Sequence, residues 1–208
     1  FGFYVDQSTG KKLSSRASVA NVMTLLEMSE EYFRTRMSER GNQSEAERNT
    51  AAKELSIGSL VFNDLEQDMK GSVEIDVSSL ENTINGFEKS GGAYVVYSAC
   101  RARSILRRHG KAPRPVDEIG AFELSDQEVD LLLKLQQTPA RVNVAATTNN
   151  PTEMIRHALD VAMAYNSWYM NAPVLGDDGP NEARLLITNA VYLVLRNVLA
   201  LCHITCPE

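Results

Sequence analysis

Apolar residues recur every three to four positions along most of the chain, a spacing that gathers them on one face of an α-helix. On this basis, helices are predicted at about 24–40, 45–65, 79–85, 93–109, 126–137, 139–147, 151–170 and 181–202. Extended structure is predicted for the first few residues and for Val73, Ile75 and Val77, which alternate with other residues. We therefore expect an all-α fold, a helical bundle preceded by a short strand and loop that end near residue 20.

Helix-start and helix-end signals support this outline. Five segments have a capping residue followed three positions later by Glu, the spacing of a capping box. The capping residues are Thr24, Ser44, Ser78, Ser125 and Asn150, and the matching glutamates are Glu27, Glu47, Glu81, Glu128 and Glu153. Gly41, Gly86 and Gly110 stand where helices are expected to end, because glycine adopts the left-handed conformation that closes a helix.

Two loops and one boundary interrupt the helical pattern. Residues 110–124 and 171–180 contain prolines and glycines and are predicted to be loops. A boundary between two parts of the chain is predicted near 86–92, where glycines surround a short polar stretch. Before this boundary, the second predicted helix should pack closely against a neighbour because it carries small residues, namely Ala51, Ala52, Gly58 and Ser59.

The composition is that of an ordinary soluble globular protein, with 43% hydrophobic and 23% charged residues among 208. No apolar run approaches the roughly 20 residues that span a bilayer, so no membrane partner is expected. Three cysteines are too few for a disulfide framework and favour the reducing cytoplasm. Cys202, His203 and Cys206 offer three ligands without a second cluster, so we interpret the cysteines as reduced thiols and expect no metal site. The apolar opening at Phe1 favours a strand cut from a larger sheet, and hence a fragment.

The net charge of −6 argues by itself against a nucleic-acid partner, but the charges are unevenly distributed. One segment has several cations and no acid: Arg101, Arg103, Arg107, Arg108, Lys111 and Arg114. It follows directly on Tyr94 and Tyr97. Tyr97 and Arg101 are four residues apart and therefore share a helix face. Tyrosine rings and guanidinium planes stack on unpaired bases, so this segment is a candidate nucleic-acid site; the alternative is a core tyrosine beside a solvated arginine.

A second candidate site is the segment 10–16, which reads Gly-Lys-Lys-Leu-Ser-Ser-Arg. Such a loop suits a phosphate group, because its cations neutralise the charge while hydroxyl and backbone N–H groups donate to the oxygens. On composition alone, an exposed polar turn is the simpler interpretation.

Several segments, taken in order, resemble the C-terminal part of arginyl-tRNA synthetases, which are class I aminoacyl-tRNA synthetases with a DALR-type anticodon-binding domain. The segment from Ser90 to Arg107 is similar to G-N-T-G-P-Y-L-Q-Y-A-x-x-R-x-x-S-I-L of that family, although Val96 replaces the usual Gln. The matching residues are Tyr94, Tyr97, Arg101, Ser104, Ile105 and Leu106. Residues 164–175 resemble F-N-x-F-Y-x-x-C-P-V-L, and residues 194–208 resemble V-L-R-N-G-L followed by I-x-x-P-E. With 57–65, similar to G-I-G-A-x-x-x-x-D-L, the resemblance covers essentially the whole chain.

The resemblance assigns roles to the two candidate sites. Lys12, Ser14 and Arg16 match the KMSKS-type loop, which in class I synthetases closes over ATP (bound with Mg²⁺), although Ser15 stands in place of its second lysine. The anticodon loop of tRNA(Arg), whose middle base is cytosine in most arginine tRNAs, would lie against the other site. Contacts with the anticodon loop are implied for Tyr97 and Arg101, nucleic-acid binding also for Tyr94, and phosphate contacts for Arg103, Arg107, Arg108 and Lys111.

The resemblance also implies a domain organisation: a catalytic-domain tail at 1–23, connecting helices at 24–90 and the anticodon-binding domain at 91–208. A full-length enzyme of this family attaches arginine to tRNA(Arg) using ATP. The 208 residues lack the family's His-Ile-Gly-His segment, so we expect them to bind tRNA, as a monomer, without forming an adenylate. The alternatives left open are a free-standing tRNA-binding module derived from such an enzyme, the helical tail of another class I synthetase, and a helical scaffold with no nucleic-acid role.

Overall fold

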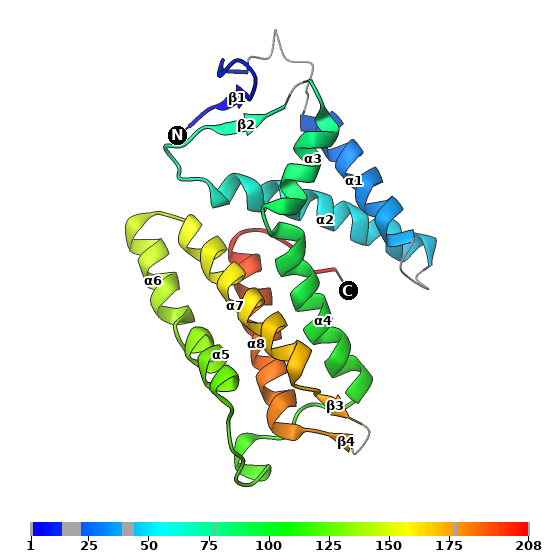
Figure 1. Ribbon diagram of the computed structural model, residues 1–208, viewed down its shortest axis with the longest axis vertical. Helices are drawn as coiled ribbons and strands as arrows, with labels where there is room; N and C mark the ends of the chain where they lie inside the picture. Colours follow the sequence, from blue (N-terminus) through cyan, green and yellow to red (C-terminus); the bar gives the residue numbers. More distant parts are fainter. Residues whose placement is uncertain (1, 14–21, 39–43, 77, 177–178, 208) are drawn as a thin grey trace. The chain divides into compact units, whose positions relative to one another are not determined.

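The computed structural model describes residues 2–13, 22–38, 44–76, 78–176 and 179–207. Most of these residues are helical, which confirms the all-α prediction. The chain divides into two compact units (Figure 1). Unit 1 comprises Phe1–Ala93 together with Cys202–Glu208, and unit 2 comprises Tyr94–Leu201. The domain limits of 1–23, 24–90 and 91–208 remain a prediction.

Unit 1 combines three helices with one short pair of strands. Its elements are β1 (Tyr4–Asp6), α1 (Val22–Ser38), α2 (Glu45–Glu66), β2 (Val73–Ile75) and α3 (Leu80–Lys89). The two strands pair in parallel, with Tyr4 opposite Val73 and Asp6 opposite Ile75. Helix α1 packs along α2, and α3 contacts both. The core between them contains large apolar side chains that are almost fully buried, among them Leu25, Phe33, Leu55, Phe62, Ile75 and Phe87.

The small residues of α2 are buried, as predicted, and they let neighbouring segments approach closely. A Cβ atom added at Gly58 would meet the Cγ2 atom of Ile204 at 3.0 Å, so the last residues of unit 1 lie directly over α2. A Cβ atom at Gly92 would meet the Cβ atom of Phe62 at 2.8 Å. Glycine is therefore needed at position 92 for close packing.

Unit 2 is a group of helices. Its elements are α4 (Gly92–His109, from Tyr94 onward), a 3-10 turn (Val116–Glu118), α5 (Asp126–Gln136), α6 (Thr138–Thr148), α7 (Thr152–Asn171), a hairpin of β3 (Leu175–Gly176) with β4 (Gly179–Pro180), and α8 (Glu182–Leu201). Helix α7 contacts α5, α6 and α8 and forms the centre of the unit. Its buried face carries Tyr165 and Trp168, both of which are almost inaccessible to solvent. Trp168 is thus a core residue.

The observed helix ends correct several sequence predictions. Complete capping boxes form at Ser44 and at Ser125. Helix α1 begins at Val22, so Thr24 lies inside it instead of capping it. The hydroxyl of Ser78 donates to Asp76 and does not cap α3. The neighbouring Ser79 takes the capping role, because its hydroxyl accepts the N–H of Asn82.

Two further helix ends, predicted at Asn150 and Gly86, also differ. The side chain of Asn150 accepts the N–H of Thr152, but Glu153 pairs with Arg141 and does not complete a capping box. Gly86 lies within α3 and does not end it. Gly110, by contrast, follows α4 with a φ of 75°, as predicted for a helix-ending glycine. Gly41 lies outside the described residues.

Helix α8 is long and apolar enough to cross a membrane by length and composition. Its burial gives a simpler account, because one face of the helix packs in unit 2 against α7 and α5. The buried residues include Leu185, Val191, Leu195 and Leu199. An apolar helix in the centre of a helical unit passes the same test of length and composition.

Candidate nucleic-acid interface

Helix α4 carries a continuous exposed stripe of aromatic and basic residues. Tyr94, Tyr97, Arg101, Ser104 and Arg108 follow one another at intervals of three or four residues, and all are exposed. The tyrosines are 40% and 38% exposed, so Tyr97 is not a core aromatic. Another side of α4 carries the buried residues Val95, Ala99, Ala102 and Ile105. Alternation of these two sets along the helix fixes the stripe at the surface.

The guanidinium of Arg101 is held by a partner on α7. It donates to the side-chain oxygen of Asn166, a residue that is 9% exposed. The amide nitrogen of Asn166 in turn donates to the hydroxyl of Ser98 at 2.7 Å, and Ser98 donates to the carbonyl of Tyr94 at 2.7 Å. This chain of hydrogen bonds satisfies two buried polar side chains and places the Arg101 side chain at the same time.

Arg101 keeps its positive charge in this arrangement. Asn166 is neutral, so it orients the guanidinium without neutralising it, and a guanidinium has further N–H donors beyond the one used here. Its central carbon also lies 5.6 Å from the centroid of the Tyr169 ring, within the range of a cation–π contact. A charged group of fixed orientation between two tyrosines, Tyr97 on the same helix face and Tyr169 on α7, suits a planar ligand that offers acceptor atoms.

Sequence reasoning did not assign a role to Asn166, Tyr169 or Ser98. Asn166 and Tyr169 both lie in the segment 164–175, whose similarity to the synthetase family was visible. That similarity marked the segment but could not show that it meets α4. The contact joins residues 65 positions apart, and no local spacing predicts it.

A hollow of about 340 Å³ lies at the later end of α4 in unit 2. It is lined by Ile105 and Arg108 of α4, Tyr169 and Met170 of α7, and the segment Pro173–Val174–Leu175. Its volume is near the lower end of the roughly 300–1,000 Å³ that small-molecule sites occupy. Arg108 gives the hollow a positive charge, and Met170, which is 84% exposed, borders it with a flexible apolar side chain.

The remaining predicted phosphate contacts lie elsewhere around α4. Arg103 is two residues from Arg101 and therefore about 200° around the helix, so the two do not share a face. Arg103 is half-buried and Arg107 is exposed beside it, four residues on. Lys111 is exposed just beyond the helix end. Arg114, which ends the basic segment, lies 3.5 Å from Glu182 and is partly neutralised.

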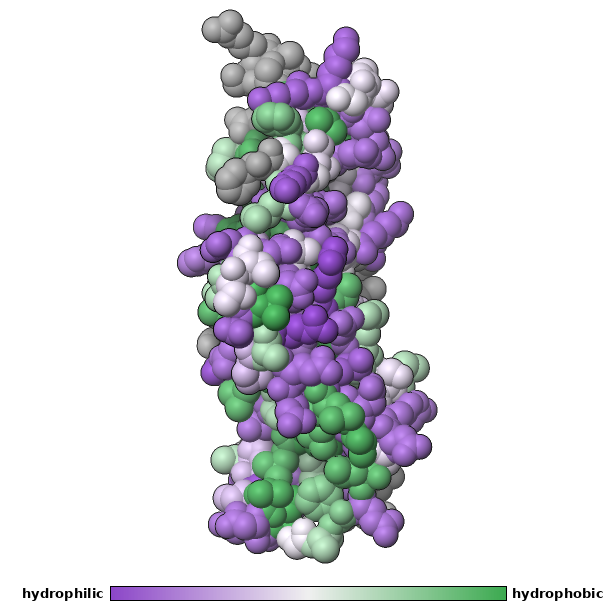
Figure 2. Space-filling view, turned by 90° about the vertical axis from the view of Figure 1, so that its left-hand side faces the viewer, coloured by the Kyte–Doolittle hydropathy of each residue, from purple (hydrophilic) through white to green (hydrophobic). Residues whose placement is uncertain are grey.

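Another face of unit 2 has the opposite character. This face is formed by α5 and the segment before it. Figure 2 shows an apolar area at its lower end. The exposed large apolar residues of this stretch are Val116, Phe122, Leu124, Val129 and Leu133. Between residues 115 and 133 there are several acids and no Lys or Arg. A polyanion is not attracted to such a surface, whereas the α4 stripe carries the cations Arg101 and Arg108.

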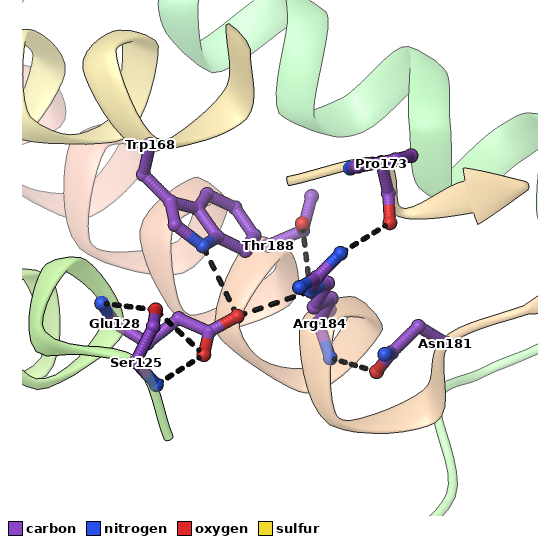
Figure 3. Close-up of polar contacts among 7 residues, drawn as sticks. All are labelled: Ser125, Glu128, Trp168, Pro173, Asn181, Arg184 and Thr188. Atoms are coloured by element: carbon purple, nitrogen blue, oxygen red, sulfur yellow. Dashed lines mark hydrogen bonds and ion pairs between the residues drawn. The ribbon is translucent and has the colours of Figure 1, made fainter. Parts of the chain in front are cut away.

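A buried carboxylate, Glu128, connects α5, α7 and α8 (Figure 3). Glu128 closes the capping box of α5 with Ser125, accepts the indole N–H of Trp168 at 3.2 Å and pairs with Arg184 at 3.0 Å. Burial raises the pKa of Glu128, but the hydrogen bonds from Ser125, Trp168 and Arg184 together outweigh burial and leave that pKa below its usual value. The carboxylate is thus charged and fully engaged at neutral pH.

The segment predicted to bind phosphate is described only in part. The backbone of Lys12 pairs with that of Val5 in an isolated antiparallel β-bridge. The ammonium of Lys12 lies 3.8 Å from the centroid of the exposed Phe3 ring. The turn before it is held by the Asp6 carboxylate, which accepts hydrogen bonds from Ser8 and Thr9. Ser14 and Arg16 lie outside the described residues. Among the described residues there is no group of three His, Cys, Asp or Glu side chains that could hold a metal ion.

Residues 95–208 match the DALR anticodon binding domain family. This match covers more than half of the 208 residues, and the chain belongs to that family. Two of its curated relatives are arginine–tRNA ligases. The ligase of Pediococcus pentosaceus is 33% identical over 201 residues, which are 96% of this chain and 34% of the relative. That of Latilactobacillus sakei is 32% identical over 205 residues, again 96% of this chain and 34% of the relative.

Solved structures agree with this assignment at the level of the fold. The arginyl-tRNA synthetase of Thermus thermophilus superposes on 99% of this chain with a TM-score of 0.75 and 23% identity, and the match takes up 34% of the bacterial protein. The chain therefore spans about a third of the length of the relatives that it matches. The resemblance inferred from the sequence segments is confirmed.

Proposed function

We propose that the chain binds tRNA through the exposed face of α4, with an anticodon loop lying against Tyr94, Tyr97 and Arg101. The observation that carries this proposal is the guanidinium of Arg101, held by the neutral side chain of Asn166 beside exposed Tyr97, in a domain of the anticodon-binding family. A bidentate donor of fixed orientation distinguishes bases by the acceptors on their pairing edges. Cytosine offers two such acceptors, so it fits the arrangement better than a base with a donor at that place.

Stacking and charge would supply the remaining affinity. Each unpaired base that stacks on an aromatic ring contributes about 1–3 kcal/mol, and Tyr97 is exposed for such a contact. Arg103, Arg107, Arg108 and Lys111 would bind phosphate oxygens, which fixes the position of the RNA without reading its sequence. The surroundings of these cations support different roles for them. Arg101 is oriented by a neutral partner and suits a base contact, whereas Arg107 and Lys111 extend into solvent and suit phosphate contacts.

The whole protein, by analogy with the ligases that the chain matches, would attach arginine to tRNA(Arg) in the cytoplasm using ATP and Mg²⁺. In that protein Lys12, Ser14 and Arg16 would stabilise the phosphates of ATP, and residues 1–23 would belong to the catalytic domain. The 208 residues alone lack the adenylate-forming segment. They should therefore bind tRNA as a monomer but give no ATP–pyrophosphate exchange above background.

Filter binding of the 208-residue chain to purified tRNA species tests the proposal. We expect tRNA(Arg) to bind more tightly than tRNAs with other anticodons, and we expect the logarithm of the affinity to fall linearly with the logarithm of the salt concentration. Replacing the middle anticodon cytosine of tRNA(Arg) should remove the preference and leave the salt dependence. Equal affinity for all tRNAs would refute base recognition, and no binding at low salt would refute the proposal as a whole.

A further inference from the structure

We propose that Arg184 is a positioning residue for the RNA site: it holds the Pro173–Leu175 wall of the hollow beside Arg108 in its binding shape. This inference rests on the proposed binding of tRNA at the α4 face. Arg184 is on α8, and no sequence motif had given it a role. Its side chain contacts Glu128 and the carbonyl of Pro173 (Figure 3).

One guanidinium joins two places that are far apart in the sequence. The Nε atom of Arg184 donates to Glu128 at 3.0 Å, and its Nη1 atom donates to the carbonyl of Pro173 at 3.1 Å. The planar fork of arginine can serve both acceptors at once, whereas the ammonium of lysine is a point donor on a flexible stem. The side chain therefore acts as a bridge between the carboxylate and the loop after α7.

The backbone of Arg184 and its carboxylate partner are both held in place. The backbone N–H of Arg184 donates to the side chain of Asn181 at 3.0 Å, which fixes the start of α8. At the other end, Glu128 is only 4% exposed and is held by Ser125 and Trp168. A buried carboxylate with this many donors has little freedom to move. The position of Arg184 is thus set by α5, α7 and α8 together.

The bridge ends on the wall of the hollow. Pro173, whose carbonyl Arg184 holds, is the first residue of the wall, and the carbonyl of the next residue, Val174, accepts the N–H of Asn181 at 2.9 Å. Two successive wall carbonyls are therefore tied to the start of α8. The same wall faces Arg108 and Tyr169, which lie at the end of the α4 interface. Loosening the wall should change the shape of the hollow without removing any group that contacts phosphate.

Arg184→Lys tests the inference, and Arg141→Lys is its matched control. Arg141 pairs with Glu153 at 3.2 Å on the α6–α7 side of unit 2, away from the hollow. In the free chain, Arg184→Lys should speed hydrogen exchange of the Asn181 amide, which is bonded to the wall. In filter binding it should lower the affinity for tRNA(Arg) about tenfold, which is near the smaller effect expected for the loss of one stacked base. Competitor tRNAs and the salt dependence should be unchanged, and Arg141→Lys should change none of these measurements.

The other outcomes overturn the inference in distinguishable ways. Unchanged exchange at Asn181 would mean that Arg184 does not fix the wall, and faster exchange with unchanged tRNA(Arg) binding would mean that the wall is not part of the site. Equal weakening of all tRNAs with a shallower salt dependence would make Arg184 a phosphate contact. If wild-type chain binds no tRNA, the proposed function fails and this inference with it. If Arg184→Lys does not fold, Leu175→Ala replaces it, because it truncates a wall residue that is 39% exposed. Leu175→Ala must then weaken the binding of tRNA(Arg) selectively. Unaffected tRNA(Arg) binding in this variant would refute the role of the wall.

Discussion

The guanidinium of Arg101 on α4 donates to the side-chain oxygen of Asn166 on α7, so that a buried amide orients the arginine that faces the proposed RNA site. The neutrality of Asn166 is the important property, since a carboxylate in its place would pair with the guanidinium and cancel its charge. A neutral clamp and a charged clamp give the arginine the same orientation but different attraction for RNA. This distinction leads to the first prediction.

Asn166→Asp should keep the Arg101 side chain in place and weaken RNA binding. The new carboxylate forms a charge-assisted pair with Arg101 and adds a negative charge beside a polyanion. We expect tRNA(Arg) affinity to fall about tenfold, equivalent to roughly 1.4 kcal/mol. The urea midpoint should fall less than in Asn166→Ala, because the carboxylate keeps a partner for Arg101 and loses only the N–H that Asn166 donates to Ser98. The comparison variant, Asn166→Ala, leaves Ser98 and Arg101 without their partner and should lower both affinity and stability. Unchanged affinity of Asn166→Asp would show that the charge of Arg101 is not used.

Arg101→Ala and Arg107→Ala should have different effects on tRNA selectivity. Arg101→Ala should cost tRNA(Arg) about 1–3 kcal/mol more than it costs other tRNAs, because it removes an oriented base contact. Arg107→Ala should weaken all tRNAs alike and reduce the salt slope by about 1, because it removes one phosphate contact. Binding titrations at several salt concentrations measure both quantities. A uniform loss for both variants would make Arg101 a phosphate contact as well.

Glu128→Gln should destabilise the chain at neutral pH and flatten its response to acid. The pKa of Glu128 is lower in the folded chain than its usual value of 4.5. The carboxylate therefore contributes its full stabilisation above pH 4.5, and this stabilisation is lost as the pH falls below 4.5 through the lowered pKa. At pH 7 the substitution should cost about 2 kcal/mol, the scale of hydrogen bonds to a charged group. Urea unfolding at pH 7 and near pH 3.5 measures the change. Glu153→Gln, which breaks the more exposed pair with Arg141, should cost less.

His157 should make the stability of the chain depend on pH just below neutrality. Its ring nitrogen Nε2 lies 2.9 Å from the Thr138 hydroxyl, and burial, followed by the nearby Arg141, lowers the pKa of the imidazole, against a smaller opposing effect of Asp160. The unfolded chain therefore binds a proton that the folded chain does not, so stability is complete above the usual value of 6.5 and falls as the pH drops below it.

The measurement for His157 is the urea midpoint at pH 7.5 and 5.5. The urea midpoint of the wild type should fall on acidification. The midpoint of His157→Gln should fall less, since glutamine cannot take up the proton. His109→Gln, the same change at a histidine outside this contact, is measured alongside as the control. Parallel curves for wild type and His157→Gln would contradict the prediction.

Two glycine-to-alanine substitutions in unit 1 should change stability in opposite directions. Gly92→Ala forces a methyl group against Phe62 and should cost about 1–3 kcal/mol, the usual range for an overpacked core. Gly86→Ala meets no atom within 4 Å in the interior of α3 and should gain about 1 kcal/mol from the better helix propensity of alanine. Thermal or urea unfolding gives both values, and a loss of stability for Gly86→Ala would contradict the assignment of that glycine to a helix interior.

Much of the fold could be predicted because helix formation depends on near neighbours. The apolar repeat placed the predicted helices close to their observed limits, except that α3 continues to Lys89, well past the predicted end at residue 85. The capping boxes at Ser44 and Ser125 were visible as pairs three residues apart. The predictions failed where tertiary or loop contacts competed with the local signal. The hydroxyl of Ser78 donates to Asp76 instead of capping α3. At Gly86 no contact competed: the local signal itself misled, because a glycine with an ordinary helical conformation can stand inside a helix.

By itself the sequence determined the helical architecture, the family and the exposed row from Tyr94 to Arg108, because each depends on spacing along one segment. Glu128 shows where that ends. Its capping box with Ser125 followed from a separation of three residues, but its burial and its pairing with Arg184, 56 residues later, were decided by the packing of α5, α7 and α8. The same holds for Arg101 and Asn166, which the tertiary structure brings together from 65 residues apart. Spacing fixes which side chains share a helix face, and only packing between helices fixes which side chains meet.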